Sequence, residues 1–448
     1  MMRLNRTHVT EGPVGSTLIR LVLPMIGGVL TMMLFNLVDT FFIARLGAVP
    51  LAAIGFTFPV VFVITGTTMG MGIGMASVVS RAVGEGDHRR VAEITTRGLI
   101  FVVVLVLIFV AGGLWLHDRI FALLGADEAL ITLIHRYMFP WFLGVPFLVI
   151  PMIGNSAIRA TGDSFTPSLI MIIAGGVNVI LDPLLIFGIG PFPRLELQGA
   201  ALATVFSYFI TFAAASWILI RRERMILFRV PPLVGLFETW GRLLHVGFPA
   251  VLTNMLIPIS GGILTRIMAG YGPQAVAAFG VCVRIESLVM VGAFAMSTVM
   301  IPFAGQNFGA GRADRVRAGL RFGRRYCVII SLALWVVLAF SARTIAGWFS
   351  ADPVIIEIIR PFLMFVPLSY GGFGYMLLVT ASFNGAGLPR HAMVLFGSRL
   401  FVFTVPLAVL GSYVAGIPGV FAAMFLGNIG SGLLAHWMVG RHPALVQE

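Results

Sequence analysis

The chain has 448 residues, of which 58% are hydrophobic and only 11% are charged. Because an average soluble domain carries about a quarter charged residues, this composition predicts a membrane protein with many spans. All 30 positively charged side chains are arginines, which excludes a Schiff-base lysine and the lysine of a phosphate-binding loop. The formal net charge of +12 comes mainly from arginines in short loops, so it indicates membrane topology and not a nucleic-acid-binding surface.

Twelve apolar segments are long enough to cross a bilayer core of about 30 Å. They predict an all-α polytopic membrane protein with spans at 17–44, 52–80, 93–115, 131–152, 166–188, 197–220, 243–270, 274–302, 318–340, 357–379, 391–412 and 416–438. Half of the arginines lie in the loops after spans 2, 6 and 8, whereas the loops after odd-numbered spans hold few. By the positive-inside rule, we expect both termini to lie in the cytoplasm.

The sequence repeats itself at an offset of 225 residues. This offset aligns Pro24 with Pro249 and Arg90 with Arg315, together with many glycines, and it needs no gap. Each half then holds six spans, and an even number makes the two halves parallel repeats with a pathway expected at their interface. The expected parts are an N-terminal tail 1–16, a six-helix lobe 17–222, a cytoplasmic linker 223–242, a second six-helix lobe 243–440 and a cytoplasmic tail 441–448.

The first span carries one carboxylate, Asp39, well inside the apolar stretch. A charged group at the bilayer centre costs about 2.5–3.5 kcal/mol even on the mildest scale, so it is rare unless it faces a cavity or a partner. Asn36 lies three residues earlier on the same helical face, and Pro24 permits a bend earlier in the span. An acid, a polar companion and a proline on one helix predict a switch, with Pro24 as its hinge.

Two further polar positions share the depth of Asp39. Asn178 and Asp182 are one helical turn apart in the fifth span, and Thr204 lies in the sixth. Counted from the outer ends of their spans, these positions and Asp39 lie roughly 7–11 Å below the outer boundary. With Asn36, they predict one oxygen-rich pocket that binds a proton or a hard cation such as Na+.

The two acids of this predicted pocket belong to the first half alone. The repeat aligns Asp39 with Leu264 and Asp182 with Leu407. Each acid could instead be a structural hydrogen-bonding group between helices, and Pro183 strengthens that alternative for Asp182, because a proline frees backbone groups that need partners.

The second half has one deeply placed acid, Glu286, with Arg284 two residues before it. These two residues are a candidate polar site of the second lobe, although a pair with Arg284 or Arg266 would make Glu286 structural. The glycine clusters 70–74 and 371–374 are expected to permit close helix packing. The sequence has no HExxH, no GxSxG and no cluster of cysteines and histidines, so we expect neither an enzyme nor a bound cofactor.

The chain contains the stretches LVLPMIGGVLTMMLFNLVDTFFIARLG, LAAIGF and its repeat VAAFGV, the turns VGEGD and FGAGR, IRATGDSFTPS and NVILDPLLIFGIG. Together they resemble the multidrug and toxic compound extrusion (MATE) family, most closely the prokaryotic branch named after DNA-damage-inducible protein F. The resemblance implies twelve helices in two six-helix lobes, a central cavity, and export of organic compounds against protons or sodium ions. The branch's helix-1 acid falls on Asp39, its residues on helices 5 and 6 fall on Asn178, Asp182 and Thr204, and its helix-1 proline falls on Pro24.

We therefore expect a multidrug antiporter of the bacterial or archaeal cytoplasmic (inner) membrane, coupled to H+ or Na+, that exports hydrophobic or cationic organic compounds by alternating access. Its expected partners are small organic substrates and membrane lipids, with no nucleic acid, and it is expected to act as a monomer. The alternative is a flippase or exporter of lipid-linked or polysaccharide precursors, which would call for a more basic cavity than the few mid-span arginines provide. The sequence leaves the substrate and the coupling ion open.

Overall fold

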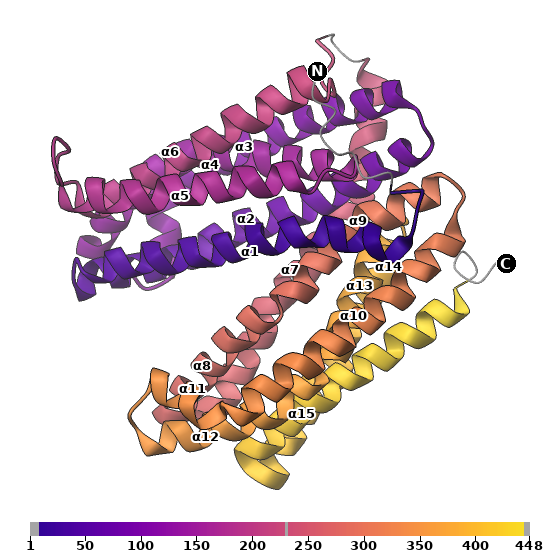
Figure 1. The fold of residues 1–448 in the computed structure, drawn as a ribbon. Helices are drawn as coiled ribbons and strands as arrows, with labels where there is room; N and C mark the ends of the chain where they lie inside the picture. Colours follow the sequence, from indigo (N-terminus) through magenta and orange to yellow (C-terminus); the bar gives the residue numbers. More distant parts are fainter. Residues whose placement is uncertain (1–8, 229–231, 443–448) are drawn as a thin grey trace. The chain divides into compact units, whose positions relative to one another are not determined.

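The structure, a computed structural model, describes residues 9–228 and 232–442, except for the side chain of Asn36 (Figure 1). Every regular element within these ranges is a helix. The prediction of an all-α membrane protein is therefore confirmed.

The first half of the chain forms six long helices. They are α1 (Val14–Ala44), α2 (Ala48–Gly84), α3 (His88–Leu123), α4 (Glu128–Ala160), α5 (Phe165–Phe187) and α6 (Glu196–Trp217), which continues into the π-helical turn η1 (Ile218–Arg222). The second half is more broken. It contains α7 (Leu233–Ala269), α8 (Pro273–Val289), α9 (Val291–Gly309), α10 (Ala313–Phe340), α11 (Ala342–Phe349), α12 (Pro353–Phe365), η2 (Val366–Ser369), α13 (Tyr370–Gly385), α14 (Pro389–Ser398), η3 (Arg399–Thr404) and α15 (Val405–Arg441).

The number of membrane passes follows from helix length. Within the described ranges, ten helical stretches are long and apolar enough to cross a membrane, and the bent pair α8 and α9 makes an eleventh. The last of the ten, 389–441, has 53 residues, far more than one pass needs. It is broken at Gly416, whose φ of 63° suits a residue without a Cβ atom. This stretch covers two predicted spans, so the structure agrees with twelve passes.

The chain divides into two compact units, and both divisions fall inside long helices. One unit contains Leu23–Val251, and the other contains residues 9–22 together with residues 252–442. The divisions lie within α1 and α7, beside Pro24 and Pro249, which the sequence repeat aligns with each other. The predicted lobe limits of 17–222 and 243–440 stay a prediction, because compactness and sequence repetition divide a chain by different criteria.

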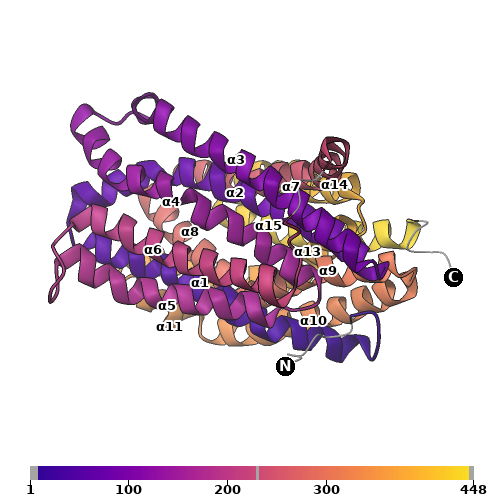
Figure 2. The same cartoon turned by 90° about the horizontal axis from the view of Figure 1, so that it is seen from above.

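The fourth pass of each half is its most deeply buried helix. In the first unit, α4 packs against α2, α3, α5 and α6, while α5 and α6 run side by side in both views (Figures 1 and 2). In the second unit, α13 packs against α9, α10, α14 and α15. The most apolar window of α4 is 67% buried, and that of 353–385 is 72% buried, whereas those of the other eight long helical stretches are at most 33% buried. Hydropathy does not separate these core helices from lipid-facing ones, because lipid tails are as apolar as a protein interior.

The predicted glycine clusters lie at close helix contacts, which confirms their packing role. A Cβ atom on Gly70 would lie 2.5 Å from the backbone nitrogen of Val251, and one on Gly74 would lie 2.6 Å from the carbonyl oxygen of Leu243. In the second unit, a Cβ atom on Gly372 would lie 2.6 Å from the carbonyl oxygen of Asn428. Only a residue without a side chain lets these backbones approach so closely.

We predict that Gly74→Ala lowers the thermal stability of the purified protein, whereas Gly112→Ala does not. The added methyl group at position 74 meets the backbone of α7, which cannot move aside as a flexible side chain would, and overpacking of this kind costs roughly 1–3 kcal/mol. At Gly112 in α3 no atom lies within 4 Å of the added Cβ atom, so the variant gains helix propensity without a clash. Unfolding curves in detergent measure both variants, and equal melting temperatures would contradict the assigned contact.

Candidate ion-coupling site

The packing of α1 along α5 places the two predicted acids at one level. A Cβ atom on Gly175 of α5 would lie 2.7 Å from Cγ2 of Thr31 on α1. Further along both helices, the rings of Phe42 and Phe187 meet with their centroids 6.1 Å apart. Asp39 and Asp182 both lie between these two contacts, and the charge of Asp39 acts on Asp182. The structure therefore brings together the acids that depth counting placed at the same height.

Asp182 belongs to a buried polar group that joins α5 to α6. Asn178, Asp182 and Thr204 are each at most 3% exposed. The side-chain amide of Asn178 donates to Oδ1 of Asp182 at 3.2 Å, one helical turn along α5. The same nitrogen lies 3.5 Å from Oγ1 of Thr204, at the outer limit of a hydrogen bond. Three of the predicted site residues thus form one contiguous group.

Several acceptor oxygens of this region have no donor. Oδ1 of Asp39, Oδ1 of Asn178 and Oδ2 of Asp182 are all buried without a hydrogen-bond partner in the described part of the chain. A buried polar atom left without a partner costs about 1–3 kcal/mol, so such atoms are uncommon in native proteins. Oxygen acceptors without donors are what a proton or a hard cation such as Na+ would satisfy.

The remaining predicted members of the site lie on α1. Asn36 is in the helix, and its side chain lies outside the described part of the structure. Pro24 is inside α1, which continues helically through it, two residues after the point where α1 passes from one compact unit to the other. The hinge role of Pro24 stays a prediction.

Sequence reasoning missed two tyrosines beside the acids. Tyr137 on α4 and Tyr208 on α6 both lie within reach of the charge of Asp39, and Tyr137 is 7% exposed. A weak signal for them exists in the sequence, because the chain has 37 phenylalanines but only 7 tyrosines. A tyrosine inside an apolar span adds a hydroxyl group that phenylalanine lacks, and that group needs a polar partner.

The candidate polar site of the second lobe has a different composition from the expected one. Arg284 is exposed, and neither Arg284 nor Glu286 forms an ion pair within the described residues. The attractive charge on Glu286 comes from Arg399, in η3. Arg399 donates to Oδ1 of Asn428 at 3.1 Å and stacks over the ring of Phe373 at 3.8 Å. We therefore propose Arg399, which the sequence analysis did not single out, as the partner of Glu286.

We predict that replacing the two N-terminal acids by leucine, the residue at both aligned positions of the second half, changes stability in opposite directions. Asp39→Leu removes a buried oxygen that has no partner, so the melting temperature should rise. Asp182→Leu takes the acceptor away from the buried amide of Asn178, so the melting temperature should fall. Each effect should amount to roughly 1–3 kcal/mol in detergent unfolding curves. Shifts of the same sign in both variants would contradict the difference in partners.

Comparison with known proteins adds three findings. The MatE family model matches residues 24–184 and 249–410, one match in each half of the chain. A protein of Shewanella oneidensis described as an FAD transporter is 36% identical over 437 residues, which cover 98% of this chain and 97% of that protein. A probable multidrug resistance protein of Bacillus subtilis, YoeA, is 28% identical and covers 85% of this chain and of that protein.

The fold also matches solved structures. The Vibrio cholerae MATE transporter VcmN, solved in a bent form, superimposes with a TM-score of 0.90 at 29% identity, covering 94% of this chain and 95% of that one.

Proposed function

Because the chain belongs to the multidrug and toxic compound extrusion (MATE) family of transporters, we propose that it exports an organic compound by antiport against H+ or Na+. The family is one of transporters and not of enzymes. The chain is a membrane protein with many passes. We further propose that it lies in the cytoplasmic membrane of its host with both termini inside, and the arginine-rich loops after spans 2, 6 and 8 support this orientation.

The observation that carries the coupling proposal is the set of buried oxygens without donors on Asp39, Asn178 and Asp182. One bound cation, or a proton on one carboxylate, would satisfy lone pairs that no donor among the described side chains reaches. Thr204 contributes a further oxygen beside Asn178. Ion and substrate need only favour different conformations of the protein for the flow of one to drive the other.

The proposed conformational element is α1. Asp39 lies on it at the level of Asp182, and Pro24 lies on it beside the division between the two compact units. A proline in a helix removes one backbone hydrogen bond, so bending at Pro24 breaks fewer bonds than bending elsewhere in α1. We therefore propose that ion binding at Asp39 changes how α1 packs on α5, with Pro24 as the hinge.

Two substrate classes have support. The relative that covers 98% of this chain at 36% identity is described as an FAD transporter, which favours a flavin dinucleotide. YoeA, at 28% identity, is described as a multidrug resistance protein, which favours the hydrophobic or cationic compounds expected from the sequence. We rank the flavin dinucleotide first, because substrate preference is conserved better between closer relatives. The flippase alternative ranks lower, since neither relative carries such a description.

We predict that Asp39→Asn abolishes ion-driven export and leaves the protein folded in the membrane. The amide keeps the shape of the carboxylate but cannot carry the charge that exchanges with the ion. Purified protein in vesicles should release internal substrate when a proton gradient or a sodium gradient is imposed separately, which also identifies the ion. Export by Asp39→Asn at the wild-type rate would refute the coupling role.

Pro24→Ala should keep ion binding and slow export, because the unbroken helix resists bending.

A second prediction concerns the substrate. In the same vesicles, a gradient of the coupling ion should drive FAD out, and the export of FAD should be competed by unlabelled FAD but not by a hydrophobic cation such as ethidium. If ethidium is driven out and FAD is not, the multidrug description applies and the flavin assignment is wrong. Vesicles without protein and vesicles without a gradient are the controls.

A further inference from the structure

The unit Leu23–Val251 also contains a polar pocket that is lined by none of the proposed coupling residues. It has a volume of about 480 Å³ and is lined by the end of α2, the turn that follows it, the start of α3 and the start of α7. Pockets that bind small ligands have volumes of about 300–1,000 Å³, so this one is large enough for a ligand. Its charged and titratable side chains are Arg81, Glu85, Arg90, Glu238, Arg242 and His245.

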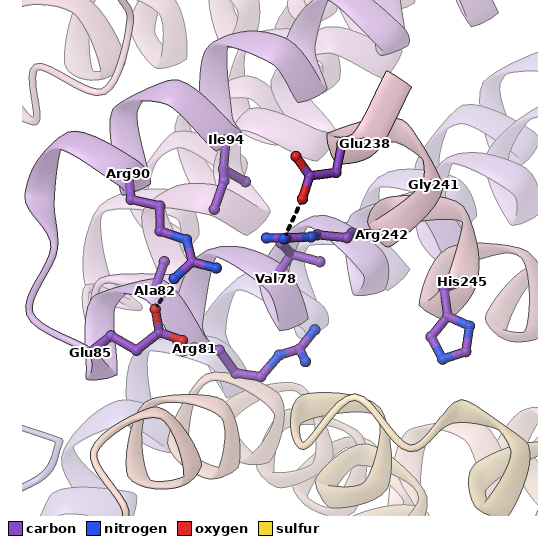
Figure 3. Close-up of a pocket in the computed structure, with 10 residues that line it drawn as sticks. All are labelled: Val78, Arg81, Ala82, Glu85, Arg90, Ile94, Glu238, Gly241, Arg242 and His245. Carbon is purple, nitrogen blue, oxygen red and sulfur yellow. Dashed lines mark hydrogen bonds and ion pairs between the residues drawn. The ribbon is translucent and has the colours of Figure 1, made fainter. Parts of the chain in front are cut away.

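Three guanidinium groups from three different helices face this pocket (Figure 3). Arg90 pairs with Glu85, and Arg242 pairs with Glu238. Arg81 forms no ion pair within the described residues, although the charge of Glu85, one turn later in the chain, attracts it, and its Nε donates to the carbonyl oxygen of Ser77, one turn earlier in α2. Both of its terminal nitrogens therefore remain for another acceptor. With His245 neutral, the pocket carries one positive charge in excess.

The sequence repeat shows that the fold does not require these charges. At the offset of 225 residues, Arg81 aligns with Gln306, and Arg242 aligns with Thr17. Gln306 and Arg81 lie at equivalent places, each three residues before the end of its helix, α9 or α2. The same local architecture is therefore built around a neutral side chain in α9. A structural role for the extra arginines would call for arginine in both halves.

The other compact unit shows what the counterpart of Arg90 binds. Arg315, which aligns with Arg90, donates to the backbone carbonyl oxygens of Val9, Glu11 and Gly12 at 2.8–3.3 Å. Arg312 donates to the carbonyl of Thr10. Residues 9–12 align with residues 234–237, which lie at the start of α7 in the unit Leu23–Val251, where the backbone carbonyl groups accept hydrogen bonds within the helix. Of the two arginines that bind residues 9–12, only Arg315 has an arginine counterpart in the pocket, Arg90, and Arg90 pairs with Glu85. The pocket adds Arg81 and Arg242, for which no such chain oxygens are present among its lining residues.

From this comparison we propose that the pocket binds the phosphate groups of an anionic ligand, with Arg81 as the main contact and Arg90 and Arg242 beside it. A guanidinium group presents a planar fork of donors that matches phosphate oxygens in two parallel hydrogen bonds. A diphosphate would supply acceptor oxygens to this pocket, as the carbonyl groups of residues 9–12 do for Arg312 and Arg315 in the other compact unit. The inference rests on the proposed function in one respect: it takes the diphosphate of a dinucleotide substrate as the source of the phosphate groups.

The test is a calorimetric titration of the full-length purified protein, in neutral detergent, with inorganic pyrophosphate. Arg81→Gln and Arg242→Thr introduce the residues that the second half has at these positions. Each should weaken pyrophosphate binding roughly tenfold or more, because a hydrogen bond to a charged group contributes about 1.5–3 kcal/mol. Arg81→Lys, which keeps the charge, should retain part of the affinity. The matched control is Arg89→Gln, since Arg89 is 87% exposed and pairs with Glu93 outside the pocket.

Further arms of the experiment identify the source of the phosphate. If it is the substrate, FAD competes with pyrophosphate and riboflavin, which lacks phosphate, does not. If it is a lipid headgroup, nanodiscs with phosphatidylglycerol block pyrophosphate binding and nanodiscs of phosphatidylcholine do not. Both results support a phosphate site. Binding that is unchanged in Arg81→Gln and Arg242→Thr, or no binding of pyrophosphate by the wild type in phosphatidylcholine nanodiscs, overturns the inference.

In these assays, the coupling proposal and the phosphate-binding proposal can each be refuted without refuting the other. Asp39→Asn should lose ion-driven export but bind pyrophosphate as tightly as the wild type, because Asp39 is not among the residues that line the pocket. If the wild type exports no FAD at all, the proposed substrate is wrong, and the pyrophosphate titration still reports on the pocket.

Discussion

The constraint on which the rest of this structure depends is the cost of keeping oxygen acceptors without donors in an apolar interior. Water satisfies such atoms at the surface of a soluble protein, but it is missing from the hydrocarbon region of a membrane. Within the described part of the chain, Asp39, Asn178 and Asp182 each keep a buried oxygen without a hydrogen-bond partner. We interpret this costly arrangement as functional, and we propose a proton or a hard cation as the missing partner of these oxygens.

The two halves of the chain solve the same architectural problem with different side chains. Both build six passes around a buried fourth pass, and both let glycines bring helix backbones together. The acids of the first half align with leucines, and the arginines at the end of α2 and the start of α7 align with Gln306 and Thr17. The repeat therefore works as an internal comparison, from which we propose that polar groups present in one half alone serve function in addition to any structural contact that they make.

Two sites of opposite sign follow from this comparison, and both lie in the unit Leu23–Val251. The oxygen-rich group on α1, α5 and α6 suits a cation, and the arginine-lined pocket at α2, α3 and α7 suits phosphate. An antiporter needs both kinds of recognition when its substrate is an anion and its coupling ion is a cation. The two sites contain different residues, so binding at one and binding at the other can be measured separately.

The sequence by itself determined the helical class, the twelve passes, the repeat and the acids at one depth, because hydropathy, helical rise and an isolated charge are local properties of the chain. Only the tertiary structure decided which passes form the core, since lipid and protein interiors are equally apolar. It also placed Tyr137 and Tyr208 within reach of the charge of Asp39, Glu286 within reach of the charge of Arg399, and arginines from three helices around one pocket. These are contacts between residues far apart in the chain, and the periodicity of a single helix does not specify which of its neighbours a side chain meets.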